Sequence, residues 1–315
     1  HNAAYGIGAM DAITTGDQNS ALGYNALSAN NTGAQNTAMG RLSLEANTSG
    51  DNNTAYGSST LSANSTADDN TAIGKGSMQA NTTGAANTAV GKDSLKANTT
   101  GTRNLAIGYQ AYTASDTEND NLAIGYQAML ANTAGGSENI AIGSYALNDL
   151  TSGDYNTVVG HYAGDVLTTG GSNTMIGQQA GSAQTTASHN TLLGAFAGEA
   201  ITTSAYNVSV GKDSLKALVD GDGSNTAVGF EAAMTTTTNT QITAIGYRAL
   251  KVAVANNSTA VGFQALKALT GGANCVAVGN SALASVIGGN NNNALGGGAG
   301  LRTTTGIENI SIGNG

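Results

Sequence analysis

Residues 87–103 read NTAVGKDSLKANTTGTR and are one copy of a unit that recurs along the whole 315-residue chain. Numbered 1 to 17, the unit has the pattern N-T-A-I-G-x-x-A-L-x-A-N-T-T-G-x-x, and every copy has glycine at position 5. Of the eighteen intervals between these glycines, fifteen are 17 residues, two are 18 and one is 16. A period that spans the whole chain predicts one supersecondary unit stacked on copies of itself.

The irregular intervals end at Gly143, Gly229 and Gly262. They are the places where we expect the structure to depart from a regular coil.

Positions 2 to 4 of the unit predict a short strand. Position 4 is apolar in every copy and is mostly β-branched, as Val90 and Ile107 illustrate, which favours a strand. Side chains alternate between the two faces of a strand, so we expect position 4 to point inward and position 3 to point the other way. Position 5 is expected to need glycine because the strand end requires a positive φ and a close approach of the next coil.

The second half of the unit predicts a second apolar point and a polar ladder. Position 8 is small and position 9 is usually Leu or Met. Four copies have glycine at position 9, namely Gly164, Gly181, Gly198 and Gly300. Leu167 and Ile201, three residues later, are expected to refill the core in two of them, and the other two show no such compensation. Asn at position 1 predicts a ladder of amides along the stack.

Composition excludes several classes of protein. The chain has 45 Gly, no Pro, no Trp, 4% aromatic and 10% charged residues, and this scarcity of charge and Pro argues against disorder. A net charge of −9 argues against nucleic acid as a partner, and no apolar run is long enough for direct membrane insertion. The single cysteine, Cys275, excludes a disulfide framework and is expected to be a buried small residue.

These observations together predict an all-β protein. The expected fold is a parallel β-solenoid of the left-handed β-roll type with about 18 coils, forming a single domain over residues 1–315 that belongs to a longer fibre protein. Each coil has only two reliably large apolar side chains, which is too few for a triangular β-helix of one chain. We therefore expect either a flattened two-sheet roll or association of chains through the Ala-rich columns. An intertwined or side-by-side homotrimer is favoured, with end-to-end stacking as an additional form of self-association.

The repeats resemble two known families. Segments such as NTAVGKDSL (87–95), NLAIGYQAM (121–129) and STAVGFQAL (258–266) are similar to the head repeats of trimeric autotransporter adhesins and to the shafts of phage tail fibres. The 17-residue unit is longer than the adhesin repeat. The resemblance covers essentially the whole chain and implies a trimer, an extracellular location on a virion or cell surface, and attachment to a host receptor or glycan.

One segment has the composition of a metal-binding turn. Asp220, Asp222 and Ser224 alternate with glycines in an 18-residue interval, and alternating oxygen ligands suit Ca²⁺. The alternative interpretation is a solvated turn with two acids. No other cofactor is expected.

Aromatic residues follow the position-5 glycine in several repeats. Tyr109, Tyr126 and Tyr247 could form a stripe that contacts a glycan, or could serve lateral packing between subunits. His161 and His189 have no paired Asp or Ser at a consistent spacing, and acidic residues such as Glu118 are interpreted as solubilising charges in turns. The sequence therefore predicts no catalytic residues and no enzyme.

The function predicted from the sequence is a non-enzymatic structural fibre or shaft for attachment to a host or surface. One alternative is an ice-binding solenoid, because Thr37, Thr54, Thr71 and Thr88 align at strand spacing, although this column changes to Leu105, Leu122 and Ile140. A second alternative is a self-stacking subunit of an extracellular filament.

Overall fold

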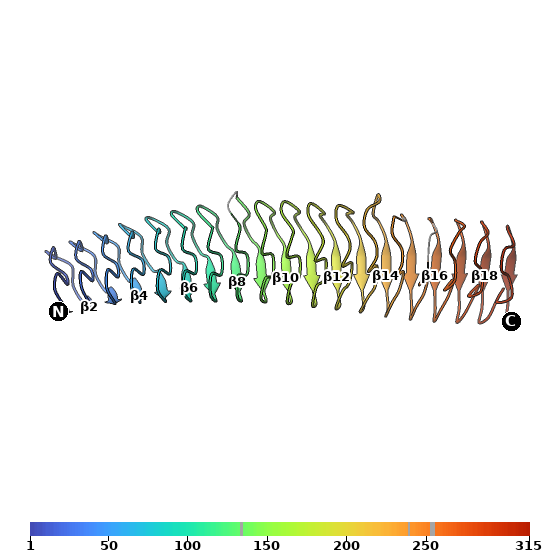
Figure 1. Cartoon of the computed structure of the whole chain (residues 1–315), viewed down its shortest axis with the longest axis horizontal. Coiled ribbons are helices and arrows are strands. Elements are labelled where there is room, and N and C mark those ends of the chain that lie inside the picture. Colours follow the sequence, from blue (N-terminus) through green and yellow to red (C-terminus); the bar gives the residue numbers. More distant parts are fainter. Residues whose placement is uncertain (133–134, 239, 253–255) are drawn as a thin grey trace. The chain divides into compact units, whose positions relative to one another are not determined.

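A computed structural model describes residues 1–132, 135–238, 240–252 and 256–315. It divides into two compact units, His1–Tyr155 and Asn156–Gly315. In both units the regular secondary structure of the described residues consists of parallel three-residue strands, one in each coil (Figure 1). The predicted all-β parallel solenoid with a repeat of about 17 residues is therefore confirmed.

Strands occupy positions 2 to 4 of each repeat. The strands of the first unit are β1 (Ala3–Tyr5), β2 (Ser20–Leu22), β3 (Thr37–Met39), β4 (Thr54–Tyr56), β5 (Thr71–Ile73), β6 (Thr88–Val90), β7 (Leu105–Ile107), β8 (Leu122–Ile124) and β9 (Ile140–Ile142). Those of the second unit are β10 (Thr157–Val159), β11 (Thr174–Ile176), β12 (Thr191–Leu193), β13 (Val208–Val210), β14 (Thr226–Val228), β15 (Thr243–Ile245), β16 (Thr259–Val261), β17 (Val276–Val278), β18 (Asn293–Leu295) and β19 (Ile310–Ile312).

Register between strands is kept where the repeat length changes. Leu122 pairs with Ile140 across an 18-residue interval, and Thr243 pairs with Thr259 across a 16-residue interval. The added or missing residue therefore falls outside the strands, and the strand columns continue unbroken through these coils.

Backbone hydrogen bonds also join the coils outside the strands. In the coil of residues 87–103, the Leu95 N–H donates to Ala111 O (3.0 Å) in the next coil, and the Asp93 N–H donates to Lys75 O (3.0 Å) in the preceding one. Similar bonds recur in most repeats. Since backbone pairing extends around the coil, every copy must follow nearly the same path, and this requirement explains the strict period.

The position-5 glycines have no room for a side chain. At Gly108 φ is +137°, and a Cβ atom would lie 2.2 Å from the carbonyl oxygen of Gly125 in the next coil. The predicted need for glycine is confirmed at this position, on both the positive φ and the close backbone approach.

The core side chains come from positions 1, 3, 8, 9 and 12. Ala89, Ser94 and Leu95 are fully buried in one coil, together with the asparagines at positions 1 and 12. Position 4 does not contribute to this core. Ile73 is 39% exposed, whereas Ala72 beside it is fully buried. The expectation that position 4 points inward was therefore wrong, because the narrow coil places the small Ala opposite Leu and turns the larger residue outward.

The amide ladder predicted at position 1 is present and buried. The Asn104 N–H donates to Asn87 Oδ1 (2.9 Å), and Asn87 Nδ2 donates to Gly101 O (2.8 Å). A second ladder, which the sequence pattern did not predict, runs along position 12 of the first unit, where Asn98 Nδ2 donates to Asn81 Oδ1 (2.7 Å). The interior of each coil is thus held by amide hydrogen bonds as well as by apolar contacts.

In most coils where position 9 is glycine, a larger side chain at position 3 of a strand fills the space in the core. Val158, Met175 and Leu192 replace the usual Ala at position 3 in the coils that carry Gly164, Gly181 and Gly198. A Cβ atom on Gly181 would lie 2.6 Å from Met175 Sδ, so the methionine occupies the space that Leu fills elsewhere. The expectation that Gly181 lacks compensation was wrong. A Cβ atom on Gly300 would lie 2.6 Å from Cδ2 of Leu283 in the preceding coil, so this leucine occupies the space there.

If Met175 fills the space left by glycine at position 9, a larger residue at position 181 should compensate for a smaller one at position 175. Met175→Ala should lower the free energy of unfolding by about 3 kcal/mol, because it leaves a cavity beside Gly181. Adding Gly181→Leu should recover part of that loss, since Leu95 adopts a similar positive φ (47°, against 59° at Gly181) in a coil with Ala on its strand. The recovery is incomplete because Leu192 Cδ1 would lie 2.8 Å from the new Cβ. Denaturant unfolding followed by circular dichroism measures both effects. A double variant no more stable than Met175→Ala would contradict this exchange of volume in the core.

Candidate interaction surface

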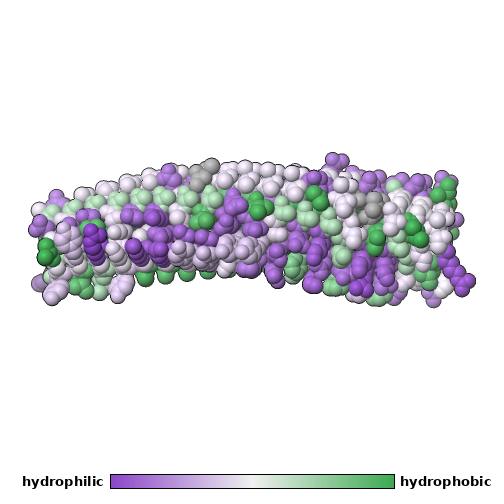
Figure 2. All heavy atoms as spheres, in the orientation of Figure 1, coloured by the Kyte–Doolittle hydropathy of each residue, from purple (hydrophilic) through white to green (hydrophobic). Residues whose placement is uncertain are grey.

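The outer side of the strands is an uncharged surface in both units, with an apolar row along position 4 beside a column in which Thr is the commonest residue. We call the outward side chains at positions 2 and 4 the strand face. In the 19 described strands these two positions contain no Asp, Glu, Lys, Arg or His, although the chain has 31 Asp, Glu, Lys and Arg residues in total. Position 4 is Ile, Val, Leu, Met or Tyr throughout, with Tyr56 56% and Ile107 37% exposed. On the side seen in Figure 2, residues of similar hydropathy form rows across successive coils of the first unit.

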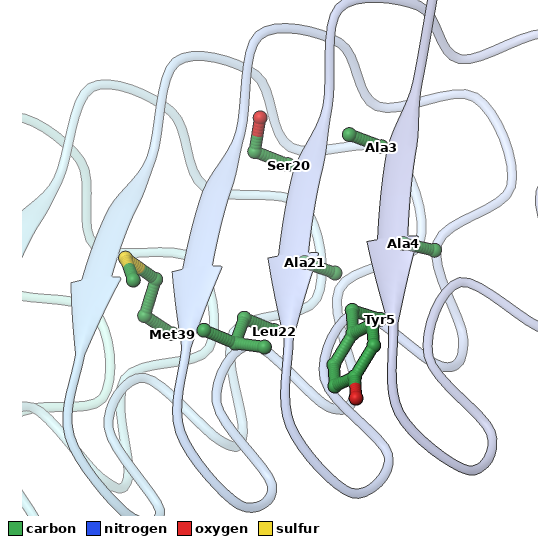
Figure 3. A pocket seen from close by; sticks show the side chains of 7 residues that line it. All are labelled: Ala3, Ala4, Tyr5, Ser20, Ala21, Leu22 and Met39. Carbon is green, nitrogen blue, oxygen red and sulfur yellow. The ribbon is translucent and has the colours of Figure 1, made fainter.

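Shallow apolar hollows lie on this strand face. In the first unit, Tyr5, Leu22 and Met39 from successive strands lie in one row along a hollow of about 270 Å³ (Figure 3). In the second unit a hollow of the same size is lined by residues of β17 to β19, including Val278 and Leu295. Large position-4 side chains form the walls of both hollows. The strand face is therefore uneven, and side chains of a partner can fit into these hollows.

The Ala-rich columns are not part of this surface. Ala72 at position 3 and Ala111 at position 8 are fully buried within the chain itself. The expectation that these columns pack against other chains was therefore wrong. The side chains that remain available for such a contact are the larger ones of the strand face.

Aromatic rings stack in rows at position 6. Tyr109 and Tyr126 are parallel with centroids 5.4 Å apart, and Phe230, Tyr247 and Phe263 form a second stack with centroid separations of 5.6 and 5.1 Å. Because Tyr247 lies between two rings, both its faces are covered, and a ligand would meet its edge and hydroxyl. Contact of Tyr109, Tyr126 and Tyr247 with a glycan remains a prediction.

Cations and carboxylates flank the second aromatic stack. Arg248 lies over the ring of Tyr247, and both Arg248 and Lys251 donate to Glu231 Oε2 at 2.7 Å. Hydrogen bonds from Lys251 and Arg248 lower the pKa of Glu231 below its ordinary value. A carboxyl group with a lowered pKa stabilises the fold above its ordinary pKa and loses that contribution as the pH falls, so this cluster favours the fold at neutral pH.

The predicted calcium turn lies on the surface. Asp220, Asp222 and Ser224 are all exposed, and Asp220 Oδ1 accepts hydrogen bonds from the hydroxyl groups of Thr202 and Thr203 (2.8 Å for the latter) in the preceding coil. These hydrogen bonds lower the pKa of Asp220. The described part of the chain contains no group of three or more His, Cys, Asp or Glu side chains arranged to hold a metal ion.

Weak calcium binding is the expected result at this turn. With one carboxylate engaged by Thr202 and Thr203, we expect a dissociation constant of about 1 mM or weaker, in the range of weak extracellular modules. Calorimetric titration with CaCl₂ measures it, and the double variant Asp220→Asn, Asp222→Asn should abolish any heat. Micromolar affinity, or affinity unchanged in the double variant, would contradict this expectation.

Glu118 is a structural residue rather than a solubilising charge. It is 3% exposed, and its Oε2 accepts hydrogen bonds from the Ser115 hydroxyl (3.1 Å) and the Asp116 N–H (2.8 Å). The same coil has Tyr112 at position 9, fully buried, with its hydroxyl accepting from Asn121 Nδ2 (2.5 Å). Burial raises the pKa of Tyr112. The expectation for Glu118 was wrong, and its replacement of Gly at position 15 was the signal that could have revealed it.

Cys275 and the histidines occupy the environments expected for them. Cys275 is fully buried at position 1, where its thiol donates to Gly289 O (3.3 Å). His161 and His189 are exposed and contact Tyr162 and Tyr206 through their rings. These contacts are between neighbouring aromatic rings on the surface.

Fold and surface together define a parallel β-solenoid repeat protein whose uncharged strand face carries a row of apolar side chains. Comparison with known proteins gives no matching family model and no matching curated relative. Within the described residues, no helix is long and apolar enough to span a membrane.

Proposed function

We propose that this chain is a non-enzymatic structural segment of an extracellular fibre or surface adhesin that associates with copies of itself and serves attachment. The strand face carries this proposal. Each coil adds an outward apolar side chain to it, and exposed apolar patches of this extent mark interaction sites in soluble proteins.

A second copy of the chain is the partner that best fits this face. A copy has the same spacing between coils, so its rows of position-4 side chains can stay in step with these rows over many coils. The absence of charge from positions 2 and 4 of the described strands avoids the burial of unpaired ions in such a contact. Closed cyclic symmetry covers the face on every copy, and among cyclic arrangements we propose a homotrimer because the repeats resemble those of trimeric fibres.

The resemblance of the repeats supports the same role. Similarity to trimeric autotransporter adhesin heads and phage tail-fibre shafts favours a trimer on a virion appendage or cell surface. In this role the chain holds or forms an attachment surface for a host receptor or glycan.

Charged substitutions on the strand face test the proposal. Val90→Glu with Ile107→Glu places two carboxylates on the face, whereas Thr100→Glu with Thr117→Glu adds the same charges to exposed turns of the same two coils. Size-exclusion chromatography with light scattering should find an oligomer for the native protein and the turn variant, and a monomer for the strand-face variant. Equal masses for the two variants would count against the strand face as the interface.

Ice binding is a second candidate, favoured by one observation. Thr occupies position 2 in ten of the 19 described strands, in runs of four, three and three, and each of these threonines is half-buried beside a position-4 side chain. Such runs form short ladders at strand spacing. A thermal-hysteresis assay decides this candidate: activity lost in Thr54→Leu with Thr71→Leu would support it, and no activity in the native protein would exclude it.

A further inference from the structure

A shallow groove with a mainly apolar lining and several polar side chains crosses three coils of the second unit. It has a volume of about 650 Å³ and lies on the turns that follow β10, β11 and β12. Five of its lining residues are polar and half-buried, namely Tyr162, Asp165, Gln179, Ser182 and Glu199. This groove is distinct from the strand face, because its residues come from positions 7, 10 and 11 of the repeat.

The repeat places the polar groups of the groove at regular intervals. Asp165, Ser182 and Glu199 occupy position 10 in three successive coils, so the two carboxylates are separated by two coil spacings, roughly 10 Å. This distance is too great for both carboxylates to bind one metal ion, whose oxygen ligands lie at about 2.5 Å. The arrangement instead suits an extended ligand with several hydrogen-bonding groups.

The chemistry of the groove matches the hydroxyl groups of a sugar. Carboxylates accept hydrogen bonds from hydroxyls, and the amide of Gln179 and the hydroxyl of Ser182 can both donate and accept. Ala183 and Ala200 supply small apolar surface between these groups, against which the C–H face of a sugar ring can pack. One coil spacing, about 4.8 Å, is close to the length of one residue in an extended sugar chain.

The charge of the groove selects against acidic ligands. Asp165 and Glu199 contribute two negative charges to the lining, and the cation nearest to them, Lys216 of the next coil, is shared between Glu199 (3.4 Å) and Asp213 (3.0 Å). An acidic sugar would therefore meet like charge. We propose that this groove binds a neutral oligosaccharide that lies across the three coils. This inference rests on the attachment role proposed above, for which it names a ligand class and a site, and it does not depend on whether the chain forms a trimer.

Binding of defined sugars to the intact protein tests the proposal. The probes are cellohexaose, chitohexaose, maltohexaose and mannohexaose, with hexamannuronate as the acidic control, and the measurements are calorimetry and saturation-transfer NMR. We expect at least one neutral hexaose to bind with a dissociation constant of about 1 mM or tighter, and hexamannuronate to bind more weakly. Failure of all four neutral sugars to bind would overturn the proposal.

A filled-groove variant with a matched control locates the site. Ser182→Tyr fills the centre of the groove, and Ser62→Tyr makes the same change at position 10 in the first unit. The affinity for the bound hexaose should fall by roughly tenfold or more in Ser182→Tyr and stay unchanged in Ser62→Tyr. Equal affinities in these two variants would place the binding elsewhere and overturn the assignment.

A charge-only variant keeps the test decisive if Ser182→Tyr does not fold. Asp165→Asn with Glu199→Gln preserves the shape of the groove but replaces strong acceptors with weaker ones. The affinity for the neutral hexaose should fall several-fold, and the discrimination against hexamannuronate should shrink. Unchanged affinity together with unchanged discrimination would contradict a role for these carboxylates.

Discussion

Gly108→Ala should lower the free energy of unfolding by about 3 kcal/mol or more, one of the largest effects of any single substitution in this protein. The added Cβ would lie 2.2 Å from Gly125 O, and an alanine at φ +137° is strained even without that clash. The backbone of one coil cannot move away alone, because it is hydrogen-bonded to the coils on both sides. Urea unfolding followed by circular dichroism gives the change.

Gly271→Ala is the matched control for this experiment. Gly271 has no positive φ, and a Cβ atom added to it would have no neighbouring atom within 4 Å. Alanine should therefore change the free energy of unfolding by less than about 0.5 kcal/mol at this position. If Gly108→Ala and Gly271→Ala were equally stable, the position-5 glycine would not be required by the stacking of coils.

Asn87→Leu is expected to have a comparable effect on stability through the buried ladder. It removes the acceptor of the buried Asn104 N–H and one of the two donors to Gly101 O, which keeps its hydrogen bond from Asn98 Nδ2 (3.1 Å). Leaving the buried Asn104 N–H unpaired costs about 1 to 3 kcal/mol, so we expect a loss of about 2 kcal/mol in the free energy of unfolding.

An exposed asparagine separates this effect from a general cost of replacing Asn. Asn280 lies on the surface at position 6, where Phe263 stands one coil earlier, and Asn280→Leu should change stability by less than about 0.5 kcal/mol. The ladder itself is interrupted at Ile242, Ser258 and Cys275 and resumes at Asn292. A loss below about 1 kcal/mol for Asn87→Leu would mean that the Asn104 N–H finds another partner and that the ladder does not hold the coil together.

The sequence period was enough to predict the solenoid, its short strands and its glycine requirement. It was not enough to predict which side of the strand faces inward. Alternation requires only that Ala72 and Ile73 point opposite ways, and the larger residue was taken to be the core residue. The interior is too narrow for that choice, because Leu at position 9 already fills it. The pair Met175 and Gly181 shows this in the sequence, because the side chain at position 3 is large where the residue at position 9 is glycine.

A surface feature could be predicted from the sequence only where the same residue type recurs at one position of successive repeats. Tyr109 and Tyr126 stack because they share position 6 in adjacent coils, and this was visible in the sequence. The groove was not predicted, because Asp165 and Glu199 are 34 residues apart and differ in residue type. Comparison of position 10 between repeats would have brought them together, but the sequence alone does not show that the turns around them leave a hollow.

Sedimentation equilibrium of the native protein tests the central claim most directly, because the strand face is proposed to be covered by other copies of the chain. We predict a species of three times the chain mass of 31.0 kDa, and its conversion to monomer in the Val90→Glu, Ile107→Glu variant. A single species of 31.0 kDa for the native protein at micromolar concentration and above would contradict the claim.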